Sequence, residues 1–180
     1  MIDGIAYIKA KLPLDGDSVF LSGAQAPIVL DLANGLCVTY VEDKGDAFRY
    51  LTASDLHKAG VEQEAFHAQC VENLAKIARA KLEVRPYGNI FAMTMGGNFE
   101  ASLILIDQLW DKALPHTAPN GFIAALPARD ILAYCDARSE AGREELHQLI
   151  GRLQTSPGAD HLLLPLLFRR VGQRWERLLD

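Results

Sequence analysis

The sequence predicts an α+β fold: a single domain with a predominantly antiparallel sheet of about five to seven strands, covered mainly on one face by about three helices. Short β-branched and aromatic runs alternate with glycine-containing turns, which is typical of hairpins. Three longer segments carry apolar residues at helical spacing. With 180 residues, 49% of them hydrophobic, the chain can bury a full core without disulfide staples.

Composition excludes several classes of protein. The formal net charge is −5 with both signs interspersed, which argues against a nucleic-acid surface. The three cysteines (Cys37, Cys70 and Cys135) are an odd number and form no CxxC pair, so neither a disulfide framework nor a zinc ribbon is expected. The longest apolar stretch, 162–168, is too short to span a bilayer. We therefore expect a cytoplasmic protein with no cofactor and neither membrane nor nucleic-acid partners.

The sequence of the N-terminal third predicts an irregular arm followed by three antiparallel strands. Residues 1–26 have strand-like runs broken by Pro13, Gly16 and Gly23, so we expect an irregular N-terminal arm there and the α+β domain over 27–180. The β-rich runs 27–32 and 36–41 flank Asn34-Gly35, a strong hairpin signal, and a third run covers 47–51. Three antiparallel strands are the simplest interpretation.

A helical region follows. Thr52 or Ser54 can cap a first segment, which Gly60 interrupts before a long helix from about 61 to 81. The buried stripe of that helix consists of Phe66, Cys70, Leu74 and Ile77. Asn73 lies within this stripe and needs a partner, because an unpaired buried amide costs about 1–3 kcal/mol. It either ties the helix to neighbouring backbone or contacts a ligand.

The stretch 94–102 has the composition of a site. A hairpin around Gly88 leads into Gly96-Gly97, and Asn98 then precedes a predicted helix over 99–114 that is apolar almost all round. Free amides at the start of such a helix favour an anion. Glu100, in the predicted first turn, is either part of this site or occupies the amides itself.

Arg129 and Asp130 form the second candidate pair. The run 121–126 predicts a buried strand that Pro127 closes, so the pair falls at a predicted strand-to-helix junction. Structural ion pairing and a functional role both remain open for it. Ser139 then caps a predicted helix over 139–154, with its core stripe at Leu146, Leu149, Ile150 and Leu153, and a turn at Gly172-Gln173 predicts a terminal hairpin.

The histidines and the C-terminal arginines do not identify a functional site. The five histidines show no metal-binding spacing and no catalytic motif. Four arginines near the C-terminus could cradle an anion, although charges that protect a strand edge explain them equally well. They are Arg169, Arg170, Arg174 and Arg177.

Several motifs carry a family resemblance in their order and spacing. They are the segments 36–43, 50–56, 71–74, 96–103 and 126–130. From about residue 27 to the end the chain resembles the uncharacterised bacterial YtpQ-like family, which implies a cytosolic α+β domain and supplies no accepted activity. The positions that match its recurring motifs are Asn73, Gly97, Asn98, Glu100, Ser102, Pro127, Arg129 and Asp130.

Two functions from different classes follow. In the first, the chain is a noncatalytic binding or interaction module for a small anionic ligand or a protein partner. In the second it is a hydrolase in which Glu100 or Asp130 is a general base and Arg129 stabilises negative charge, but no nucleophile is paired with a base. The candidate ligand-binding residues are Asn73, Gly96, Gly97, Asn98, Glu100, Arg129 and Asp130. Catalytic residues and oligomeric state are not predicted.

Overall fold

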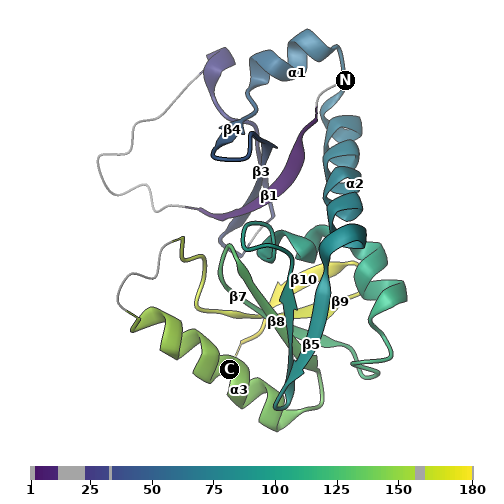
Figure 1. Cartoon of the computed structure of the whole chain (residues 1–180), viewed down its shortest axis with the longest axis vertical. Coiled ribbons are helices and arrows are strands. Elements are labelled where there is room, and N and C mark those ends of the chain that lie inside the picture. Colours follow the sequence, from purple (N-terminus) through teal and green to yellow (C-terminus); the bar gives the residue numbers. More distant parts are fainter. Residues whose placement is uncertain (1–2, 12–22, 33, 157–160, 180) are drawn as a thin grey trace. The chain divides into compact units, whose positions relative to one another are not determined.

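The computed structural model describes residues 3–11, 23–32, 34–156 and 161–179 (Figure 1). They divide into two compact units, Met1–Ile77 and Ala78–Asp180. Each unit has its own antiparallel sheet, with four strands in the first and six in the second. The α+β class is confirmed, and its strands are shared between two sheets instead of one.

The sheet of the first unit is built around one long strand. β3 (Leu36–Asp43) pairs with β1 on one edge and with β2 and β4 on the other, at different heights. The partner strands are β1 (Ile5–Ala10), β2 (Val29–Asp31) and β4 (Phe48–Tyr50). The Asn34-Gly35 turn is confirmed: φ is +53° at Asn34 and +83° at Gly35, the backbone that this dipeptide tolerates in a tight hairpin.

The segment expected to be an irregular arm contains a regular strand. β1 is paired with β3 over its whole length, and its first four residues are buried. The breakers on which the expectation rested all follow this strand, so they do not interrupt its ladder. Gly16 and Pro13 lie outside the described residues.

Two helices complete the first unit. α1 (Ala53–Ala59) has a capping box in which Thr52 and Asp55 bond each other's backbone N–H groups, and it ends at Gly60 with φ +63°. α2 (Gln63–Lys81) runs from the first unit into the second. Three of the four residues of its predicted stripe, Phe66, Cys70 and Leu74, are buried, and the fourth, Ile77, is half-buried.

The second unit has the strand order β10-β9-β7-β8-β6-β5. The expected hairpins around Gly88 and Gly172 are confirmed. The strands are β5 (Glu83–Tyr87), β6 (Ile90–Thr94), β7 (Phe122–Ala128), β8 (Ile131–Asp136), β9 (Leu167–Val171) and β10 (Arg174–Arg177). Pro127 does not close β7, since a register shift between Ala125 and Ala128 lets the strand continue.

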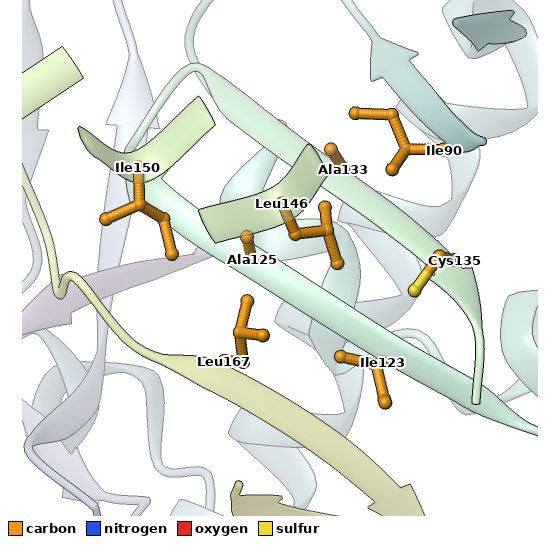
Figure 2. Packing of buried hydrophobic residues seen from close by; sticks show 8 residues of the cluster. All are labelled: Ile90, Ile123, Ala125, Ala133, Cys135, Leu146, Ile150 and Leu167. Atoms are coloured by element: carbon orange, nitrogen blue, oxygen red, sulfur yellow. The ribbon is translucent and has the colours of Figure 1, made fainter. Parts of the chain in front are cut away.

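Both faces of this sheet are covered, whereas the sequence predicts cover mainly on one. α3 (Glu140–Gln154), capped by Ser139, packs Leu146 and Ile150 on one face, as Figure 2 shows. The buried indole of Trp110 covers the other, where its ring makes edge contacts with Phe122 and Tyr134.

The predicted helix over 99–114 is wrong. The structure has two short helical turns there, η2 (Ala101–Leu105) and η3 (Leu109–Ala113). The segment is deeply buried, as its composition indicates, but side chains satisfy part of its backbone: the indole N–H groups of Trp110 and Trp175 donate to the carbonyls of Leu103 and Ile104. The segment can therefore be buried without the regular backbone hydrogen bonds of an α-helix.

All three cysteines are free and buried. Among the described residues, no helix combines the length and the apolar character needed to cross a membrane.

Truncating Leu74 to Ala should lower the free energy of unfolding of the first unit by about 2–5 kcal/mol, because its side chain is fully buried on α2. Urea denaturation measures this loss. Val29→Ala is the control, since Val29 is 56% exposed. A loss below about 0.5 kcal/mol for Leu74→Ala would contradict its core position.

Candidate functional site

The double-glycine turn binds a carboxylate of the chain itself. Oε1 of Glu100 accepts from the amides of Met95 at 2.6 Å and Gly97 at 2.7 Å, while Oε2 accepts from the amide of Phe99 at 3.1 Å. The Glu100 side chain is almost inaccessible, at 2% exposure. The amides expected from the sequence to bind an external anion therefore bind the carboxylate of Glu100 instead.

The conformation of the turn depends on its glycines. Gly96 has φ +99° and Gly97 has φ +87°, in the left-handed region that other residues rarely adopt. No atom lies within 4 Å of a Cβ placed at either residue, so backbone conformation and not crowding selects glycine here. Asn98 does not precede an α-helix, because only the short η2 turn follows it. The N-cap residue of η2 is Glu100, whose side chain makes no capping hydrogen bond.

Arg129 and Asp130 are the two turn residues between β7 and β8, not a helix start. The helix expected after this pair is absent, because the residues that follow form β8, one of the two central strands of the sheet. The backbone of Arg129 is anchored: its carbonyl accepts from the amide of Ala101 at 3.0 Å, and its amide donates to the carbonyl of His161. Within the described ranges, neither Arg129 nor Asp130 has a hydrogen bond or ion pair from its side chain.

Two of the predicted site segments, the glycine turn and the Arg129-Asp130 turn, lie next to each other. Because Ala101 follows Glu100 directly, the glycine turn and the β7–β8 turn are joined by one backbone hydrogen bond. Gly96, Gly97, Asn98, Glu100, Arg129 and Asp130 thus belong to neighbouring parts of the second unit.

Asn73 belongs to the first unit and has a structural contact. Its Nδ2 donates to the carbonyl of Gly4 at 2.9 Å, which ties α2 to the residue before β1. Its Oδ1 accepts from Gln69 and Lys76 on the same helix. Of the two interpretations of Asn73, this geometry matches the tie between the helix and neighbouring backbone.

The basic run near the C-terminus is divided between environments. Arg170 is 5% exposed in its side chain, donates to Asp107 and Asp111 and lies over the Trp175 ring. Hydrogen bonding to Arg170 lowers the pKa of Asp111 below its usual value. In contrast, Arg169, Arg174 and Arg177 are exposed. The β9–β10 register places Arg169 and Arg174 on the sheet face opposite Arg170, whereas Arg177 shares the face of Arg170. The four arginines therefore do not gather on one face as a common anion site.

A groove without a signature in the sequence lies in the first unit; we call it the first-unit groove. It has a volume of about 550 Å³, with Val61, Ala65 and Phe66 on its apolar part. The other lining residues are Glu42, Arg49, Asp55, Lys58, Ala59 and Gln69. These residues come from β3, β4, α1, α2 and, for Val61, the connection between the two helices, so no local motif marks them.

Ion pairs hold most of the charges around the first-unit groove. Arg49 donates to Glu42 at 2.9 Å and to Asp55 at 3.1 Å, and Lys44 lies 2.8 Å from Glu42. Hydrogen bonds from Arg49 and then Lys44 lower the pKa of Glu42 to about 2. Lys58 has no ion-pair partner in the part of the chain that the structure describes. The groove therefore offers one uncompensated cation.

A buried titratable pair lies behind the groove. The Tyr40 hydroxyl and Nδ1 of His67 are 3.0 Å apart, and the Tyr40 ring packs on Phe66 with centroids 4.9 Å apart. Burial, with a smaller contribution from Cys70, raises the pKa of Tyr40 to about 12, and burial lowers the pKa of His67. Near pH 7 the Tyr40 hydroxyl is therefore protonated and the imidazole is neutral, and the tautomer of His67 sets which of the two groups donates.

The described residues contain no group of three or more His, Cys, Asp or Glu side chains that could hold a metal ion.

Comparisons with known proteins identify one weak relative. The chain is 26% identical over 113 residues to "UPF0354 protein ABC2771" from Shouchella clausii (strain KSM-K16), a protein of an uncharacterised family. The match covers 62% of this chain and 42% of the relative, so the chain matches less than half of that protein's length. No family model matches the chain, and no solved structure does.

Replacing Glu100 with Gln should lower the free energy of unfolding by about 1–3 kcal/mol, because an NH₂ group would face a backbone donor in a buried site. Urea denaturation measures the change, with the exposed Glu62→Gln as control. Stability equal to the parent would show that the carboxylate is not needed by the three amides.

Acidification should destabilise the first unit through His67. A depressed pKa in the folded state means that the unfolded chain binds the proton more tightly, so the contribution of His67 to stability is complete above its ordinary value of 6.5. That contribution is lost as pH falls below 6.5 through the lower folded value. Unfolding measured from pH 7.5 to 5 should show a smaller pH dependence in His67→Gln than in the parent, whereas the exposed His57→Gln should follow the parent. Parallel curves for parent and His67→Gln would contradict the assignment.

Proposed function

We propose that this chain is a noncatalytic binding module whose ligand occupies the first-unit groove. One observation carries the proposal: a groove of about 550 Å³ combines an apolar surface at Val61, Ala65 and Phe66 with an unpaired cation at Lys58. This volume lies within the usual range for small-molecule sites, about 300–1,000 Å³. Apolar walls with a few fixed polar groups are typical of such sites.

The charges favour an anionic ligand. Glu42 and Asp55 are already compensated by Arg49 and Lys44, while Lys58 is not. A carboxylate, sulfonate or phosphate near Lys58 would gain a charge-assisted hydrogen bond. An apolar group on the same molecule would cover the surface around Phe66. We therefore propose a small anion with an apolar part, in agreement with the ligand class expected from the sequence.

In this proposal the glycine turn has a supporting role. Glu100 occupies the amides of Met95, Gly97 and Phe99, so Gly96 and Asn98 hold a loop in place instead of holding a ligand. We assign Asn73 the same kind of role, on the basis of its bond to Gly4. For the hydrolase alternative, Glu100 as base would have to leave three hydrogen bonds, and no observation favours that step.

The relative from the uncharacterised UPF0354 family supplies no activity that bears on this proposal. The finer YtpQ-like relationship rests on the motifs of the sequence and is part of this proposal, as is a cytoplasmic location.

Filling the groove should weaken binding of an amphipathic anion. The probe is 8-anilinonaphthalene-1-sulfonate, titrated into the protein by calorimetry. Ala65→Trp places an indole within the groove and should weaken binding by about tenfold or more. A tenfold change corresponds to a loss of about 1.4 kcal/mol of binding free energy. The matched control is Ala68→Trp, because Ala68 is exposed on the same helix and does not line the groove.

The charge of Lys58 is tested separately. Lys58→Gln should weaken binding of the same probe, and Lys112→Gln in the second unit should not. Absence of saturable binding by the parent, or equal affinities for the parent and Ala65→Trp, would overturn the groove as the binding site. An unchanged affinity in Lys58→Gln would overturn the anionic part of the proposal.

A further inference from the structure

A second groove lies in the other unit, between α3 and strands β5, β6 and β8; we call it the edge groove. Its volume is about 200 Å³. Ala92 of β6 and Ala133 of β8 are directly paired and lie on the sheet face that α3 covers, and Ala133 belongs to the core cluster there. Leu149 of α3 lines one side, and Tyr87, which is 63% exposed on edge strand β5, lines another.

One end of the edge groove is apolar. Tyr87 pairs with Ile90 in the β5–β6 ladder, and both line the groove. The small side chain of Ala92, which is partly exposed, comes next along β6 and leaves space in the groove, while its partner Ala133 is buried in the core. This end can therefore accept a branched or aromatic group of limited size.

The opposite end carries two charges of opposite sign. The β6–β8 register places Leu132 beside Met93, so that Asp130 lies beyond the end of this ladder. Arg152 follows Leu149 by three residues on α3, which puts both on the same side of that helix. Asp130 and Arg152 both line the groove, and neither side chain has a hydrogen bond or ion pair with another described residue.

We infer that the edge groove binds a free apolar α-amino acid. An α-amino acid carries its carboxylate and its ammonium on one carbon, next to its side chain. The carboxylate would pair with Arg152, the ammonium with Asp130, and the side chain would cover Ala92 and lie beside Tyr87. The volume of about 200 Å³ is below the range of about 300–1,000 Å³ that larger ligands occupy.

This site is separate from the first-unit groove and uses Asp130, a residue singled out in the sequence. It requires no covalent step. The two charged side chains are exposed, so they are available to an incoming zwitterion.

The ligand requirement is tested on the parent protein by NMR titration with L-leucine. Shifts should saturate and should cluster on residues 87–94, 130–133 and 149–152. Leucinamide lacks the carboxylate, 4-methylpentanoate lacks the ammonium, and glycine lacks the apolar group; each should bind about tenfold more weakly or worse, as expected for the loss of one charged hydrogen bond or the apolar contact. No saturation with leucine, or equal binding of any of these three analogues, would overturn the assignment.

Variants locate the site. Arg152→Gln and Asp130→Asn should each weaken leucine binding about tenfold. Arg177→Gln on β10 is the control, because Arg177 is exposed and does not line the groove. Leucine binding that survives both groove variants would overturn the site. Ala65→Trp should leave leucine binding unchanged, so that failure here and failure of the first-unit groove are distinguished.

Discussion

The burial of one carboxylate organises the second unit. A charged group without partners in the interior would cost several kcal/mol, so Glu100 requires donors, and three backbone amides supply them. Those amides can converge only because Gly96 and Gly97 adopt positive φ. The next residue, Ala101, then bonds the β7–β8 turn. A single polar requirement thus fixes a loop, the start of η2 and the position of a hairpin turn.

The same requirement changes where ligand chemistry can occur. A turn rich in amides is attractive to anions only while its donors are free, and here an internal side chain uses three of them. Charges without partners among the described residues are found instead at Lys58 in one unit and at Asp130 and Arg152 in the other. Both grooves combine such charges with apolar surface, which the glycine turn does not offer.

Local chemistry predicted much of the fold, and non-local contacts decided the rest. Asn34-Gly35, Thr52 and Ser139 specify their turn and caps through their own backbone and side chains, so these elements follow from sequence. The runs 131–135 and 103–106 are both continuously apolar, and such runs suit either a buried strand or a buried helix. Pairing with β7 and β6 makes the first a strand, while tryptophan donors make the second irregular.

The candidate site was predictable to a smaller extent. Composition marks Gly96-Gly97 and Glu100 as unusual, but whether the carboxylate turns inward depends on the three-dimensional course of the loop. The first-unit groove draws residues from 42 to 69 on four elements and the connection between α1 and α2, and the edge groove draws residues from 87 to 152. Their members are ordinary surface and core residues when each is considered in its own segment.

The three buried thiols give each unit its own reporter of opening. Cys37 and Cys70 belong to the first unit and Cys135 to the second, and burial raises the pKa of each thiol, which suppresses the reactive thiolate. A thiol reagent can modify them only when the surrounding structure opens. Rates of labelling at each native cysteine would therefore distinguish local opening of one unit from local opening of the other, without a mutation.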